Sequence, residues 1–295
     1  MATAPKIAAY GHVGWWEALN PPIYLISVLP ALTAFTIASR SAAPLIPFLL
    51  GTLGVVLLQH AVNVFNDITD WKRNADVEKP DSWVRFHREN TRVAEIHALL
   101  SVAAGACVGL SALHLADRWW LIGVAAPLVF LGLLYNFGKV PISYGRHSEW
   151  VTGVCYGPGV FGCLWLLRVP RATVPALFGM AAYSALAVSI LLAHQPRQVL
   201  TDSIAGKRSF AVRFGAKRAR NVSKILFMSS LLALSFALLS SPTVWITKIV
   251  FVGAALFVLF ETKRRPPSPA WNLLSSAFCT GMALTVEFVA RGSFA

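Results

Sequence analysis

The chain is dominated by long runs of apolar residues that are separated by polar segments. A helix that spans a bilayer needs about 20 mainly apolar residues, and nine runs approach that length. They are residues 22–38, 45–65, 98–116, 119–137, 150–167, 174–193, 225–239, 244–260 and 271–289. The seventh is short, so we expect it to begin earlier, near Val222. Because the runs are continuous rather than alternating, they predict helices and not the strands of a barrel.

Composition supports a membrane protein. Of the 295 residues, 56% are hydrophobic and only 13% are charged, whereas a soluble domain carries roughly 25% charged residues. This deficit is too large for a surface that faces water. With no long linker along the chain, we expect one all-α domain over residues 1–295, embedded in a lipid bilayer.

The positive charges indicate an orientation in the membrane. The net charge is +13, which in a soluble protein would suggest a nucleic-acid partner, but the positive-inside rule explains it here. If the N-terminus lies inside, the inside segments hold 20 of the 26 Lys and Arg residues and the outside segments hold six. This asymmetry predicts nine spans, with the N-terminus inside and the C-terminus outside, and no role in nucleic-acid binding.

A first group of polar residues lies at the end of the second predicted span. It contains Asn63, Asn66, Asp67, Asp70 and Asp76. Asn63 and Asp67 are four residues apart, as are Asn66 and Asp70, and Asp67 and Asp70 are three apart, so a helix presents them along one face. Carboxylates at the end of a membrane helix commonly mark function, and oxygen ligands of this kind suit Mg²⁺, which holds substrate phosphates through one or two carboxylates. The alternative is a solvated acidic cap.

A second group lies after the sixth predicted span, on the same side of the membrane. His194, Gln198 and Asp202 repeat every four residues, which predicts one helical face. Nearby cations suit phosphate oxygens, and they are Arg197, Lys207 and Arg208. Ordinary inside-facing positive charge is the competing explanation for these three.

With these two groups of residues, the chain resembles the UbiA-type intramembrane prenyltransferase family, and within it the 1,4-dihydroxy-2-naphthoate polyprenyltransferases. The segment from Asn63 to Asp76 is similar to the family pattern N-x-x-N-D-x-x-D-x-x-x-G-x-D, except that Asn74 stands at the Gly. Asp202 to Gly215 resembles its D-x-x-x-G-K-R segment. Weaker likenesses occur near Asn20 and around Glu149, and the resemblance covers roughly the first 215 residues.

The resemblance implies a fold and an activity. It implies nine helices around a central cavity in a bacterial-type cytoplasmic (inner) membrane, with Mg²⁺ between the two acidic motifs. Asp67, Asp70 and Asp202 would be catalytic, and these three with Asp76 would be the metal ligands. The diphosphate of a polyprenyl diphosphate would be bound by Asn63, Asn66, Arg197, Lys207 and Arg208. An aromatic acceptor of the type used in menaquinone synthesis would then receive the prenyl group.

Candidates for the acceptor pocket are aromatic or polar residues near the motifs. They are Tyr135, Tyr144, Tyr156, His194 and Gln198. The tyrosines fit either a pocket or the interfacial aromatic belt. His60 and Gln59, one turn before Asn63, could face the cavity or make buried hydrogen bonds. His194 could ligate a metal, although imidazole is a poor ligand for Mg²⁺, or it could make a hydrogen bond within the bundle.

The second motif departs from the family. His194 and Gln195 replace an Asn pair, Gln198 replaces an Asp, and Pro196 can kink the helix. A Gln offers a neutral carbonyl but no charge, so one Mg²⁺ site should be weakened. Three further functions therefore stay open: a UbiA-type terpene cyclase that needs no acceptor, a non-catalytic prenyl-lipid-binding member of the fold, and a transporter. A transporter is disfavoured because both acidic groups lie on one side of the membrane.

Overall fold

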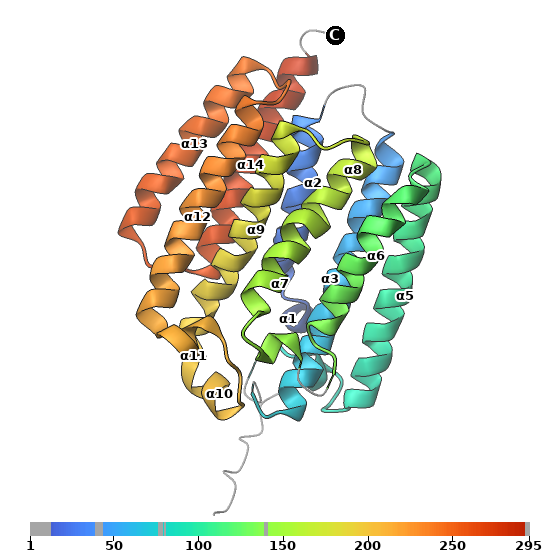
Figure 1. The fold of residues 1–295 in the computed structure, drawn as a ribbon, viewed down its shortest axis with the longest axis vertical. Helices are drawn as coiled ribbons and strands as arrows, with labels where there is room; N and C mark the ends of the chain where they lie inside the picture. The colour runs from blue at the N-terminus through green and yellow to red at the C-terminus, as the bar shows by residue number, and fades with distance from the viewer. Residues whose placement is uncertain (1–12, 39–43, 76–78, 80, 139–140, 293–295) are drawn as a thin grey trace, which may run out of the picture.

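The computed structural model describes residues 13–38, 44–75, 79, 81–138 and 141–292, and every element in these ranges is helical. The helices form one elongated bundle (Figure 1). The elements are α1 (Trp15–Leu19), η1 (Pro21–Tyr24), α2 (Leu25–Ile37), α3 (Leu45–Lys72), α4 (Trp83–Phe86), α5 (Thr91–Ala116), η2 (Trp119–Leu121), α6 (Ile122–Leu134), η3 (Ile142–Tyr144), α7 (Ser148–Val154), η4 (Cys155–Gly162), α8 (Cys163–Arg168), α9 (Val174–His194), η5 (Gln195–Arg197), α10 (Val199–Ile204), α11 (Phe210–Phe214), α12 (Ala216–Leu239), α13 (Trp245–Arg264) and α14 (Pro269–Gly292).

Within the described residues, eight helical segments are long and apolar enough to cross a membrane. The fourth predicted span, 119–137, is the exception. Its helix covers Trp119–Leu134, which at 1.5 Å per residue gives about 24 Å, less than the roughly 30 Å of a hydrocarbon core. It ends early because the side-chain amide of Asn136 donates to the carbonyl of Val62 on α3, at 2.9 Å, which turns the chain toward the site.

The seventh predicted span does begin earlier than its apolar run, as expected, since α12 starts at Ala216. The second and third spans also extend beyond their apolar runs, to Lys72 at the end of α3 and back to Thr91 at the start of α5. These polar extensions carry side chains beyond the apolar zone, and the first of them carries the first acidic motif.

Close contact between α3 and α5 depends on glycine. A Cβ atom on Gly54 would lie 3.1 Å from the carbonyl oxygen of Gly105 and 3.1 Å from the amide nitrogen of Gly109. Small residues allow membrane helices to approach in this way, since van der Waals packing drives their association. The contact fixes α3 as one wall of the interior.

The other half of the bundle has a continuous apolar core. It is formed by fully buried side chains from several helices, among them Leu29, Phe161, Tyr183, Leu186 and Phe227. This core joins α2, η4, α9 and α12, and these helices lie beside α13 and α14 in the bundle (Figure 1). The outer face is also apolar: Trp150, Ile249 and Phe288 are 77%, 68% and 76% exposed. Large exposed apolar surfaces mark contact with lipid or partners.

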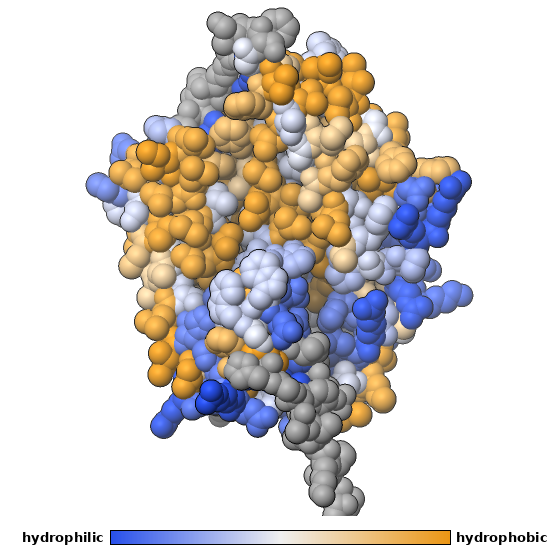
Figure 2. All heavy atoms as spheres, turned by 180° about the vertical axis from the view of Figure 1, so that it is seen from behind, coloured by the Kyte–Doolittle hydropathy of each residue, from blue (hydrophilic) through white to orange (hydrophobic). Residues whose placement is uncertain are grey.

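Figure 2 shows hydrophobic side chains over most of the upper part of one face, with hydrophilic side chains gathered mainly on its lower half. The lower end in Figure 1 holds α10, which carries Asp202 of the second motif, and α11. The described chain therefore has its polar, functional residues at one end of an apolar bundle.

Two of the helices that line the interior are irregular. The helix that starts with α7 continues as the π-helix η4, which contains Pro158; π-helical turns occur often at functional sites. The helix of α9 stops at His194, and Gln195–Arg197 form a 3-10 turn around Pro196. The prediction that His194, Gln198 and Asp202 share one continuous helical face was therefore wrong, because Pro196 breaks the helix between them.

Candidate functional site

A cavity of about 730 Å³ opens among α3, α5, α6, η4 and the turns that follow α9. Its polar end is formed by residues of both predicted motifs, including Asn63, Asp67, Asp70 and Asp202. Its remaining wall is apolar and extends along α3 as far as Gly51. Asp67 and Gly51 are 16 positions apart on one helix, so the cavity follows about 24 Å of α3. An amphipathic molecule with an anionic head and a long apolar tail matches this shape.

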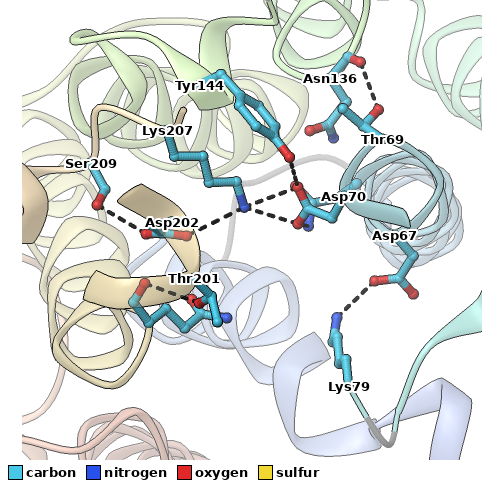
Figure 3. A network of polar contacts seen from close by, with 12 residues as sticks. Asp67, Thr69, Asp70, Lys79, Asn136, Tyr144, Thr201, Asp202, Lys207 and Ser209 are labelled. Carbon is cyan, nitrogen blue, oxygen red and sulfur yellow. Dashed lines mark hydrogen bonds and ion pairs between the residues drawn. The ribbon is translucent and has the colours of Figure 1, made fainter. Parts of the chain in front are cut away.

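Asp70 is the centre of the polar end. Its carboxylate accepts hydrogen bonds from the hydroxyl of Tyr144 at 2.8 Å and from the side-chain amide of Asn66 at 3.0 Å. The ammonium of Lys207 lies 2.9 Å from Oδ1 and 3.0 Å from Oδ2 of the same group. Figure 3 shows Tyr144 and Lys207 pointing toward Asp70 from different segments. Asp70 is only 1% exposed, so its charge is stabilised by these partners rather than by water.

Lys207 joins the two motifs. Besides Asp70, its ammonium lies 3.8 Å from Oδ1 of Asp202, whose Oδ2 accepts from the hydroxyl of Ser209 at 3.0 Å. The chain reaches this position through Gly206, which has φ +76°, a conformation that favours glycine. The amide of Lys207 then donates to the carbonyl of Asp202 at 2.8 Å. One cation therefore lies between carboxylates that come from α3 and α10.

Asp67 faces a different set of partners. It accepts from the ammonium of Lys79 at 2.7 Å and from the amide of Trp83, at the start of α4, at 2.8 Å. Lys79 and Trp83 also line the cavity. Neither residue belongs to a pattern that could be recognised in the sequence. The only signal for them was their place in the polar loop after the first motif.

Glu149 holds the second motif in place. This buried carboxylate accepts from the side-chain amide of Gln195 at 3.1 Å, from the amide of Phe210 at 2.8 Å and from the guanidinium of Arg213 at 3.3 Å. The side-chain carbonyl of Gln195 in turn accepts from the amide of Ala211 at 3.1 Å. These bonds tie the turn after α9 and the start of α11 to α7. In the sequence, the only signal for Glu149 is the resemblance of its surroundings to the family.

The structure brings most predicted residues to the cavity. Its lining includes Asn63, Asn66, Asp67, Asp70, Asp202, Lys207, Tyr135, Tyr156, His194 and Gln198. Tyr144 is buried behind Asp70 and is not part of the lining. Arg197 and Arg208 are exposed and are also outside it; the backbone amide of Arg208 instead donates to the carbonyl of Tyr144 at 3.0 Å. Asp76 lies outside the described residues.

Gln59 and His60 differ in role. Gln59 lines the cavity and donates to the carbonyl of Ile23 at 3.0 Å. His60 is not in the lining and hydrogen-bonds Tyr24 and His97. Five cavity-lining residues carry a buried polar atom with no hydrogen-bond partner among the described residues. They are Ser27, Gln59, Asn136, Ser143 and Ser148. Unpartnered polar atoms are costly, so these five positions can accept hydrogen bonds from a polar group in the cavity.

The donor chemistry at the polar end suits a hard cation. Among the described residues no group of three His, Cys, Asp or Glu side chains converges on a metal position. Mg²⁺, however, typically uses one or two carboxylates together with substrate phosphates. Asp70 and Asp202, which already share a cation in Lys207, offer such a pair. The residues present therefore fit a cation held jointly by protein and ligand.

The chain is similar to proteins of one family. A model of the UbiA prenyltransferase family matches residues 27–282 of the chain. The protein belongs to the UbiA prenyltransferase family. This UbiA-family chain is 24% identical to the 1,4-dihydroxy-2-naphthoate octaprenyltransferase of Bacillus subtilis, over 98% of its own length and 91% of the relative. It is 33% identical to the enzyme of the same name from Mycobacterium tuberculosis, over 58% and 59% of the two chains.

The fold of the family is also seen in solved structures. A UbiA homolog from Archaeoglobus fulgidus bound to GPP and Mg²⁺ aligns with a TM-score of 0.67 at 16% identity, over 93% of this UbiA-family chain and 98% of the other. The predicted family and the membrane-embedded helical fold are thereby confirmed. The predicted count of nine spans and the roles of individual residues stay predictions.

Proposed function

We propose that this protein transfers a polyprenyl group from a polyprenyl diphosphate to an aromatic acceptor that resembles 1,4-dihydroxy-2-naphthoate. The observation that supports this best is the meeting of Asp70 and Asp202 around Lys207, at the polar end of a long apolar cavity. A diphosphate head fits the polar end, and an isoprenoid tail fits the apolar wall. The two relatives described above are named 1,4-dihydroxy-2-naphthoate octaprenyltransferases, and this name describes a transfer of the same type.

Mg²⁺ is the proposed cofactor, held by Asp70, Asp202 and Asp67 together with the diphosphate; Asp76 stays a candidate ligand. When bound, it would stabilise the negative charge that builds on the diphosphate oxygens as the carbon–oxygen bond breaks. Lys79 and Lys207 approach the same region from the loops. Their ammonium groups, with the side-chain amides of Asn63 and Asn66, would orient the diphosphate. Arg197 and Arg208 would act only at long range, because both are exposed.

The proposed position of the acceptor pocket is based on buried polar atoms in the cavity wall. Gln59 Oε1, Ser143 Oγ and Ser148 Oγ are buried, line the cavity and have no hydrogen-bond partner in the part of the chain that the structure describes. They can exchange hydrogen bonds with the hydroxyl and carboxylate groups of a naphthoate. Tyr135 and Tyr156 line the same cavity, and His194 and Gln198 complete its polar rim.

The reaction follows from this placement. The allylic carbon–oxygen bond breaks and its electron pair leaves with the diphosphate, so an allylic cation forms. The π-electrons of the acceptor ring then form the new carbon–carbon bond. The attacked ring carbon loses the group that it held, as a proton or as carbon dioxide, and the ring becomes aromatic again. The faces of Tyr135 and Tyr156 can stabilise the cation, and the apolar wall excludes water that would otherwise quench it.

We further infer nine membrane crossings, with the N-terminus inside and the C-terminus outside, in the cytoplasmic membrane. Trp119–Leu134 lies parallel to its neighbours in Figure 1 and supplies the ninth crossing. The described chain begins near the lower, polar end of the bundle and α14 ends at the opposite end, which requires an odd number of crossings. The basic residues at the polar end then face the cytoplasm.

The deciding experiment measures Mg²⁺-dependent diphosphate release by the purified protein. It is run with a polyprenyl diphosphate and 1,4-dihydroxy-2-naphthoate, 4-hydroxybenzoate or no acceptor. Asp70→Asn removes the central carboxylate, and we expect a loss of at least about 100-fold. Asp117→Asn is the matched control, because Asp117 is exposed at the end of α5, at the end of the bundle away from the motifs.

Each outcome is informative. Release that requires the naphthoate and is lost only in Asp70→Asn supports the proposal and identifies the acceptor. Release without any acceptor contradicts transfer and indicates a cyclase or hydrolase. Tight binding of the diphosphate without release in any condition contradicts catalysis and indicates a lipid-binding protein.

A further inference from the structure

A chain of hydrogen bonds leads toward the surface from Tyr24, which contacts the cavity-lining Asn63, and is not used by the mechanism above. The Tyr24 hydroxyl lies 2.6 Å from Nδ1 of His60. Nε2 of His60 lies 3.0 Å from Nε2 of His97, and Nδ1 of His97 lies 3.0 Å from Nε2 of His87. The four residues come from η1, α3, α5 and the end of α4.

The inner end of this chain is at the diphosphate side of the cavity. The Tyr24 hydroxyl also hydrogen-bonds the side chain of Asn63, which lines the cavity beside Asp67. The outer end is His87, which is partly exposed. The chain therefore connects the place where the leaving group would lie with the polar surface of the bundle.

The geometry excludes a metal site. His97 uses both of its ring nitrogens on two different histidines, so the nitrogens face one another in a line instead of converging on one point. No group of three His, Cys, Asp or Glu side chains in the described ranges could hold a metal ion. A linear series of imidazoles in contact is instead an arrangement that passes protons.

The rings are held in alignment by one indole. Trp83 packs edge-on against His60 and His97, with ring centroids 4.8 Å apart in each pair, and lies 6.3 Å from His87. Its backbone amide is the group that donates to Asp67. The alignment of the imidazoles is therefore fixed by the same residue that holds a motif carboxylate.

Neutral rings are what such a chain needs. A neutral imidazole carries one N–H and one acceptor nitrogen, so three of them can link head to tail. Burial lowers the pKa of His87, which favours its neutral form at neutral pH. Within the described residues, no carboxylate hydrogen-bonds any of the three rings to hold an imidazolium.

We propose that His87, His97, His60 and Tyr24 form a proton relay that delivers a proton to the departing diphosphate, which rests on the prenyl transfer proposed above. Before transfer, His87 and His97 each carry the proton on Nε2 and His60 carries it on Nδ1. As the carbon–oxygen bond breaks, Tyr24 gives its hydroxyl proton to a diphosphate oxygen near Asn63 and takes the Nδ1 proton of His60.

In the remaining transfers, each ring that has given up a proton receives one on its other nitrogen. His60 takes the Nε2 proton of His97 on its own Nε2, His97 takes the Nε2 proton of His87 on Nδ1, and His87 takes one proton from water on Nδ1. Each bond in the chain remains satisfied and each ring changes tautomer. The balance is one proton from water to the diphosphate, with no charge left in the protein.

The test uses the full-length protein with His97→Phe, which keeps an aromatic ring beside Trp83 but removes both nitrogens. Tyr24→Phe removes the last donor. His114→Phe is the matched control, because His114 lies on the same helix and packs against Trp119 at 5.7 Å. General-acid catalysis contributes about 10²–10⁴-fold, so we expect kcat to fall by roughly 100-fold in the first two variants and to be unchanged in the third.

Loss of a merely structural role of His97 or Tyr24 would also lower kcat. The decisive measurement is therefore how the loss of kcat in each variant depends on the leaving group of the substrate. The comparison substrate is a polyprenyl difluoromethylene-bisphosphonate, whose leaving group is less basic and needs a proton less. The loss in His97→Phe and Tyr24→Phe should shrink with this substrate, and the solvent deuterium isotope effect of the wild type should decrease in both variants. An equal loss with both substrates overturns the relay.

A second reading does not depend on turnover. Nitrogen NMR of ¹⁵N-histidine-labelled protein reports the tautomers of the rings with and without bound inorganic diphosphate, which is the leaving group itself. The relay predicts that His60, His97 and His87 change tautomer together in the wild type and not in Tyr24→Phe. A wild type that binds the diphosphate but transfers nothing defeats the proposed function alone; independent tautomers in that protein defeat the relay as well.

Discussion

At the scale of single residues, the site is an arrangement of buried charges that compensate one another. Asp70 is almost fully buried but has three donors around it, and Lys207 is shared between Asp70 and Asp202. Removing one member of a buried pair leaves the other uncompensated, which is more costly than the pair itself is stabilising. Substitutions at this centre therefore change binding and stability together, and the more informative changes are those at its edge.

Gln198 is such an edge position. It lines the cavity and stands where the resemblance implies an Asp. We predict that Gln198→Asp lowers the Mg²⁺ concentration needed for half-maximal activity several-fold, because a second charged oxygen ligand is added close to Asp202. Gln198→Asn is the control that shortens the side chain without adding charge. An unchanged Mg²⁺ dependence in both variants would show that the position is outside the metal site.

At the scale of elements, the turn that follows α9 has little apolar packing of its own and depends on Glu149. Its carboxylate receives three donors from η5 and α11. We predict that Glu149→Gln lowers the thermal midpoint of the purified protein by roughly 3–10 °C, since a hydrogen bond to a charged group contributes about 1.5–3 kcal/mol. Activity should also fall, because Lys207 and Ser209 lie in the segment that is released.

Glu95→Gln is the matched control for this prediction. Glu95 pairs with Lys72 on the surface, with side chains 39% and 53% exposed, and exposed pairs contribute about 0–1 kcal/mol. A thermal scan of the two variants in the same detergent separates the buried anchor from an ordinary surface pair. Equal midpoints for the two would show that the turn is held by its backbone alone.

The sequence predicted what depends on local periodicity and missed what depends on the path of the chain. Asn63, Asn66, Asp67 and Asp70 were predicted as one constellation because a continuous helix fixes their spacing, and all four line the cavity. Lys79 and Glu149 were missed because their contacts depend on how loops fold back. Lys207 and Arg208 are adjacent cations of similar charge, but only the turn at Gly206 decides which one faces Asp70.

At the scale of the whole molecule, the basic side chains and the polar end of the cavity lie at the same end of the helical bundle. The polar end of the cavity, α10 and α11 lie together at the lower end of the bundle, and basic side chains gather along the segments that surround them. A prenyl diphosphate that enters from the cytoplasmic leaflet would meet the polar residues at once, while its tail follows the apolar wall. The orientation in the membrane is therefore part of the proposed function.

Cysteine labelling tests this orientation. Ala172 and Ser203 are both exposed, the first in the turn between α8 and α9 and the second on α10, so they lie at opposite ends of α9. In a background without the four native cysteines, we predict that a membrane-impermeant maleimide labels Ala172→Cys in intact cells and labels Ser203→Cys only after permeabilisation. The reverse pattern would place the diphosphate end of the cavity outside, away from any cytoplasmic supply of prenyl diphosphate, and would contradict both the topology and the transfer that depends on it.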